Sequence, residues 1–123
     1  MTTSPNSLSK HDLRQFTGTE HWYRHSMVRQ VLFTDGVKYV ADKGGAYWLV
    51  DEIAFAQMGN KAVAAEAFQL WKLTVWPDAT GTLTCEDGNG NAVFTKELEF
   101  TDFPLDEIRL YFASDVIMLP SEY

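Results

Sequence analysis

The sequence predicts an α+β domain: an antiparallel sheet of about five strands, with one main helix and short N-terminal helices packed on one face. Two observations predict this class. Between residues 46 and 58, apolar residues recur at the three- and four-residue spacing of a helix. From residue 68 onward, short alternating segments are separated by Gly, Pro, Asn and Asp, as in strands joined by turns.

Length and composition favour one folded unit. The chain has 123 residues, of which 46% are hydrophobic and 14% aromatic, enough for a core. Residues 1–7 are polar and predict a flexible tail, which leaves residues 8–123 as a single domain. The only cysteine, Cys85, cannot form an internal disulfide. Neither a membrane span nor the apolar core of a secretion signal is present in the sequence, so we expect a cytoplasmic protein.

The N-terminal elements are predicted from capping residues. Ser9 can cap a short helix that runs through Gln15, and Gly18 can end it in a left-handed conformation. Residues 20–29 are rich in histidine and aromatic residues without a clear period. They fit a helical turn or an irregular segment, and we expect the helical turn.

Residues 30–41 have the pattern of a first hairpin. The segments 30–34 and 37–40 alternate or are rich in β-branched residues, and the turn dipeptide Asp35-Gly36 separates them. The Gly44-Gly45 pair then interrupts the chain as a turn. The main helix follows from Ala46 to Met58, and the alanine-rich residues 61–67 predict a second, short helix.

The second half predicts strands. Residues 68–76 are apolar at both alternating sets, which indicates a central strand covered on both sides. Residues 81–86 and 92–100 then form a hairpin around a Gly/Asn-rich turn. Residues 105–119 fit either a helix or a strand hairpin. We expect the hairpin because Ile, Tyr, Phe and Val dominate the segment.

The acidic residues are concentrated in the same half. Residues 62–123 hold eleven Asp or Glu against three basic residues, a balance of −8, whereas residues 1–61 carry +1. In the strand at 92–100, Glu97 and Glu99 are predicted to face solvent while Leu98 and Phe100 face inward. An acidic sheet face repels nucleic acid and anionic membrane and suits a basic protein surface.

The histidines offer a weak metal motif. His21 and His25 would share one face of a helix, a spacing that can chelate Zn²⁺. In a metalloprotease helix the residue after the first histidine is Glu, but here it is Trp22. The Asp- and Asn-rich turn at 87–91 similarly lacks the Gly and Glu of a calcium loop. We therefore predict no metal and no cofactor.

Other candidate catalytic groups do not converge. Asp51 and Glu52 are adjacent on the main helix, so their side chains diverge by about 100°. Cys85 has no neighbouring histidine and is predicted to be a core thiol. The alternative is a ligand-binding or enzymatic site between the main helix and the sheet. Such a site would use His21 or His25 together with Asp51 or Glu52.

These observations favour a non-enzymatic protein that binds another protein. The predicted contact residues are Trp22, Tyr23, His25, Glu97 and Glu99. The alternative for Trp22 and Tyr23 is that they cover one end of the sheet. The protein is expected to be a monomer, or a homodimer joined by a sheet edge or an aromatic patch.

Four segments carry a resemblance to a known family: residues 13–19 (LRQFTGT), 34–39 (TDGVKY), 46–53 (AYWLVDEI) and 83–90 (LTCEDGNG). Together they resemble a domain-of-unknown-function family of small bacterial proteins carried in cyanobacterial, plasmid or phage-related genomes. The resemblance covers roughly residues 13–123. It implies a compact domain and mobile-element biology, and it transfers no functional residue.

Overall fold

The computed structural model of the chain describes residues 8–18 and 20–123, and the predicted tail at 1–7 lies outside this range. The helices are α1 (Lys10–Leu13), α2 (Asp35–Gly44), α3 (Tyr47–Gly59), α4 (Lys61–Ala64) and the 3-10 helix η1 (Pro120–Glu122). The strands are β1 (Trp22–Arg24), β2 (Leu32–Thr34), β3 (Phe68–Val75), β4 (Gly81–Glu86), β5 (Ala92–Leu98), β6 (Glu107–Ala113) and β7 (Val116–Met118).

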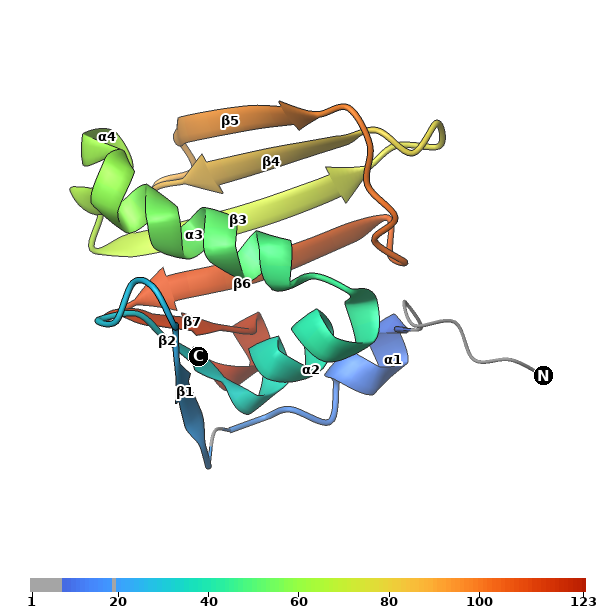
Figure 1. Ribbon diagram of the computed structural model, residues 1–123, viewed down its shortest axis with the longest axis horizontal. Helices are drawn as coiled ribbons and strands as arrows, with labels where there is room; N and C mark the ends of the chain where they lie inside the picture. Colours follow the sequence, from blue (N-terminus) through green and yellow to red (C-terminus); the bar gives the residue numbers. More distant parts are fainter. Residues whose placement is uncertain (1–7, 19) are drawn as a thin grey trace.

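The described residues form one sheet in the order β1-β2-β7-β6-β3-β4-β5. Figure 1 shows α2, α3 and α4 on one face of this sheet. The chain is an α+β protein, as predicted, but the predicted five-stranded antiparallel sheet was wrong. The sheet has seven strands and is mixed, because β2 pairs parallel with β7 while the other pairs are antiparallel.

The predicted first hairpin was also wrong. Asp35-Gly36 begins α2 instead of turning the chain, because the Thr34 hydroxyl accepts a hydrogen bond from the Val37 amide and caps the helix. The buried residues Val37, Val40, Ala41 and Gly44 recur at helical spacing. Gly45 then ends the helix in the left-handed region, at φ 61°.

Residues 20–29 contain the short strand β1 where a helical turn was expected. Trp22–Arg24 pairs antiparallel with β2, and Tyr23 lies opposite Phe33. Their rings stack with centroids 5.7 Å apart. Upstream, the Ser9 cap is confirmed by hydrogen bonds in both directions between Ser9 and Asp12, but α1 ends at Leu13 rather than Gln15.

In the middle of the chain the two predicted helices are confirmed, but the strand that was expected to be covered on both sides has only one buried face. Both α3 and the short α4 form, and Leu49, Val50, Ile53 and Ala54 of α3 are buried against the sheet. On the facing strands, the alternate side chains of Trp71, Leu73, Leu83 and Cys85 fill the core. Gln69 is buried beside them, and its amide oxygen accepts the Trp71 indole hydrogen at 2.9 Å.

The C-terminal hairpin predicted at 105–119 is confirmed as β6 and β7. Ser114 and Asp115 make its tight turn with φ of 51° and 65°. The preceding strand, β5, ends at Leu98 and not at Phe100, whose side chain is 70% exposed.

The sheet face opposite the helices is less acidic than predicted. Of the eleven carboxylates in the second half of the chain, only Glu86, Glu97 and Glu107 lie on strands. The others lie in turns, in loops and in η1. The negative charge therefore collects at the ends of the sheet, and this position determines which surface can recognise a partner.

Candidate functional site

The closest imidazole–carboxylate pair in the structure joins the β1–β2 loop to α3. His25 Nε2 lies 2.7 Å from Asp51 Oδ1. His25 Nδ1 accepts the backbone amides of Val28 at 2.9 Å and Met27 at 3.2 Å. Because Nδ1 is an acceptor, the ring hydrogen is on Nε2, which donates it to Asp51.

The imidazole of this pair is closed to a substrate, whereas the Asp51 side chain is 50% exposed. The His25 side chain is only 4% exposed, and the Phe55 ring packs edge-on against it with centroids 5.6 Å apart. Both ring nitrogens are engaged in hydrogen bonds, so the His25 ring has no nitrogen left to act as a general base. His25 therefore holds the β1–β2 loop against α3. The predicted site between the main helix and the sheet has no opening at the His25 ring.

The other residues of that hypothetical site lie apart. The His21 side chain is 69% exposed, and its Nδ1 lies 3.6 Å from Asp35 Oδ2 at the start of α2. His21 therefore does not form a common site with His25. Glu52 pairs with Lys96 of β5 at 2.6 Å and ties α3 to the edge of the sheet. Among residues 8–18 and 20–123, no group of His, Cys, Asp or Glu side chains could hold a metal ion.

Trp22 and Tyr23 point to opposite faces of the sheet, as neighbours on a strand must. Trp22 is 54% exposed and lines a hollow with Met118 and Tyr123 on the face that the helices leave open. Tyr23 faces α2, where its hydroxyl donates to Asp35 Oδ1 at 3.1 Å. This hydrogen bond raises the pKa of Tyr23.

Glu97 and Glu99 lie at the acidic end of the sheet, and only Glu97 is on a strand. Glu97 Oε2 accepts the Thr82 hydroxyl at 2.9 Å, and the same hydroxyl oxygen accepts the Trp76 indole hydrogen at 3.0 Å. Leu98, between the two glutamates, packs against the core. Sequence patterning found the two glutamates but missed Trp76, which was assigned to a strand covered on both sides.

We use the name acidic corner for the surface around these side chains. It comprises the β3–β4 turn, the end of β5 and the segment after it, which Figure 1 shows at one end of the sheet. Its members are Trp76, Asp78, Glu97, Glu99, Phe100 and Asp102. Trp76 is 49% and Phe100 70% exposed.

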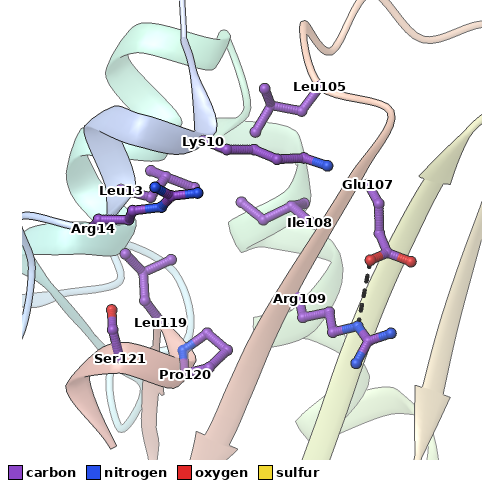
Figure 2. Close-up of a pocket in the computed structure, with 10 residues that line it drawn as sticks. All are labelled: Lys10, Leu13, Arg14, Leu105, Glu107, Ile108, Arg109, Leu119, Pro120 and Ser121. Carbon is purple, nitrogen blue, oxygen red and sulfur yellow. Dashed lines mark ion pairs between the residues drawn. The ribbon is translucent and has the colours of Figure 1, made fainter.

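A cavity of about 250 Å³ opens between α1, β6 and η1. Figure 2 shows its apolar side chains, which are Leu13, Leu105, Ile108, Leu119 and Pro120. Lys10 and Arg14 extend from α1 at its rim, whereas the Arg109 guanidinium turns toward Glu107, 3.5 Å away. No local sequence pattern indicates this cavity, because its walls come from three segments far apart in the chain.

The sequence matches the model of a family of unknown function, DUF6876, over residues 7–123. The chain belongs to this family. No curated protein matches it, and no solved structure does either. The family assignment covers nearly the whole chain and assigns it no activity. No helix in the described ranges is long and apolar enough to cross a membrane.

Proposed function

We propose that this is a protein-binding domain whose acidic corner recognises a basic, partly apolar segment of a partner. The observation that carries the proposal is chemical: four carboxylates and two exposed aromatic side chains gather at one end of the sheet. Trp76 and Glu97 are joined there through Thr82, and Phe100 and Asp102 line a hollow beside Trp48 of α3. Aromatic side chains supply most of the binding energy at protein interfaces, and charges at the rim guide orientation and association.

The corner is held in shape before any partner arrives. The Trp76 amide donates to the Thr80 carbonyl, and the Thr101 amide donates to the Ala79 carbonyl, each at 2.8 Å. The second bond ties the segment after β5 to the β3–β4 turn. A surface that is already ordered loses little conformational entropy on binding, which favours affinity.

The charge at the corner is negative at neutral pH. The hydroxyl and the amide of Thr80 both donate hydrogen bonds to the Asp78 carboxylate. These bonds lower the pKa of Asp78, and the hydroxyl has the larger effect. Lys10 lines a neighbouring hollow beside Trp76, but its ammonium pairs with Asp106 at 3.2 Å. The corner therefore suits a cationic partner surface and is unsuited to nucleic-acid phosphates.

The test uses a short unstructured peptide that carries Lys and Arg around two Leu residues. Its affinity is measured by calorimetry for the native protein and for two charge-matched variants. Glu97→Gln with Glu99→Gln should weaken binding about fivefold, as expected for two exposed charges. Glu66→Gln with Glu86→Gln removes the same amount of charge outside the acidic corner, so this variant should bind the peptide with little change in affinity.

A third variant tests the aromatic part of the surface. Trp76→Ala should weaken peptide binding by about tenfold or more, since truncated aromatic anchors commonly cost that much. Equal losses in the two glutamine variants, with no effect of Trp76→Ala, would show that the peptide responds to net charge alone. That result would exclude the corner as a specific site.

The location and the origin of the protein are further parts of this proposal. The sole cysteine supports a cytoplasmic location, since it offers no internal disulfide to an oxidising compartment. A bacterial, mobile-element origin follows from the resemblance and is tested by the genes that neighbour this one. In that setting the partner would be a basic host or defence protein.

A further inference from the structure

The cavity between α1, β6 and η1 has a chemistry that the acidic corner does not use. Its floor is apolar: Leu105, Ile108 and Leu119 are each at most 9% exposed. Ile108 lies on β6, Leu105 in the loop before it and Leu119 between β7 and η1. Leu13 of α1, half-buried, closes one side. The hollow therefore offers an apolar body a contact surface that is already formed.

Cations gather at the rim of this hollow although the protein is acidic. The lining includes Lys10, Arg14 and Arg109 against one carboxylate, Glu107, in a chain with net charge −7. Glu107 is shared between Lys72 at 3.3 Å and Arg109 at 3.5 Å. Lys10 pairs with Asp106, so two of the three cations are already partnered.

Arg14 is the cation that remains. Within residues 8–18 and 20–123, its guanidinium has no ion pair or hydrogen bond, and the side chain is exposed. Figure 2 shows it on the same side of the hollow as Leu13, between Lys10 and Leu119. A guanidinium at the edge of an apolar hollow can hold a planar carboxylate by two parallel hydrogen bonds.

We propose that this cavity binds a small amphipathic carboxylate, with its apolar body against Leu13, Ile108 and Leu119 and its carboxylate at Arg14. The volume of about 250 Å³ lies just below the range of roughly 300–1,000 Å³ that suits drug-sized ligands. The expected ligand is therefore a short acyl or aryl acid rather than a nucleotide or a long lipid.

The test compares three probes by amide NMR titration of the full chain. Octanoate carries both features, 1-octanol lacks the charge, and acetate lacks the apolar body. Octanoate should saturate a site and shift the amides of Leu13, Ile108 and Arg109. It should bind about tenfold more tightly than 1-octanol, because only octanoate forms the charged hydrogen bonds.

Two matched variants locate the carboxylate. Arg14→Gln should weaken octanoate binding by about tenfold and leave 1-octanol unchanged. Arg29→Gln removes the same charge from the exposed β1–β2 loop and should have no effect. Arg14 and Arg29 are both exposed, so neither change should disturb the fold, which the amide spectrum verifies.

The proposal is overturned if octanoate does not saturate, if 1-octanol binds equally well, or if both arginine variants respond alike. Basic-peptide binding at the acidic corner is a separate measurement. A failure of either site therefore leaves the other proposal standing.

Discussion

At the residue scale, His25 illustrates how a suggestive pair can be structural. The sequence placed His25 among the contact and catalytic candidates because it lies in an aromatic and basic segment. The alternation of β1 turns Tyr23 toward α2, and His25 then folds inward at the strand's end to accept two loop amides. Nothing in the local sequence specifies that loop, because its partner Asp51 is on α3.

The role of His25 predicts an asymmetry between the two partners. His25→Ala leaves the buried Val28 amide without its acceptor and should lower the free energy of unfolding by about 2–4 kcal/mol. Asp51→Asn keeps an oxygen that accepts the Nε2 hydrogen, and should cost less than about 1 kcal/mol. Urea unfolding measures both. Equal losses, or a neutral His25→Ala, would contradict the structural role.

Cys85 is a second residue whose role the sequence predicted. Its side chain is fully buried in the core. Burial, with a smaller contribution from the negative charges of Glu66 and Glu86, raises the pKa of the thiol to about 12. Because the thiolate is the reactive form, the folded protein should not react with iodoacetamide at mildly alkaline pH.

Unfolding in urea should make Cys85 react fully, and mass spectrometry follows both reactions. Rapid alkylation of the folded protein would show that the thiol is accessible and ionised, contrary to its position in the core.

At the element scale, α2 shows why a local signal failed. Asp35-Gly36 and the following Val-Lys-Tyr-Val favour a hairpin by propensity, but Thr34 and Gly45 are good helix caps and residues 37, 40, 41 and 44 have helical spacing. Packing decided between the two patterns. Glu122 contributes, since its carboxylate accepts the Thr34 hydroxyl at 2.6 Å and the Gly36 amide at 3.1 Å.

Two glycines at helix ends should respond in opposite directions to alanine. Gly45 has φ of 61°, so Gly45→Ala should lower the free energy of unfolding by about 1–2 kcal/mol. Gly59 is the last residue of α3, and an added Cβ there would meet nothing within 4 Å. Gly59→Ala should therefore raise stability by about 0.4–1 kcal/mol. Thermal unfolding of the pair tests this prediction, and a shift in the same direction for both would contradict the α2 cap.

The edge strand β5 bears on the predicted homodimer. It has no neighbour on one side, since the described sheet ends there. The consecutive charged residues Lys96 and Glu97 lie on it, and charged side chains on an edge strand disfavour pairing with another copy. We therefore expect a monomer, and light scattering measures it.

At the scale of the whole molecule, the sequence predicted the local hairpins β4–β5 and β6–β7 and the helices α3 and α4. These depend on contacts between neighbours in the chain, where alternation and turn residues are informative. The parallel pair β2–β7 joins Leu32 to Val116, and no local pattern specifies a contact of that separation. The extra strands and the cavity walls depend on such long-range pairing, so they were missed.

The sequence shows how many carboxylates the second half of the chain carries, but strand alternation placed them wrongly. The excess of carboxylates in the second half stands, but most of them occupy turns and loops at the ends of the sheet. Strand alternation assigns a side chain to a face only within a strand, and β5 ends before Glu99 and Phe100. The acidic corner therefore forms only when the ends of β3, β4 and β5 come together in the fold.

The measurement that tests the central claim most directly is an amide NMR titration with the basic peptide at low and at physiological salt. The account predicts shifts at the Trp76 indole hydrogen, at Thr82 and from Glu97 to Asp102. They should weaken as salt screens the exposed charges over about 8–10 Å. Shifts centred on α3 or on the Trp22 face, with the Trp76 indole unmoved, would contradict it.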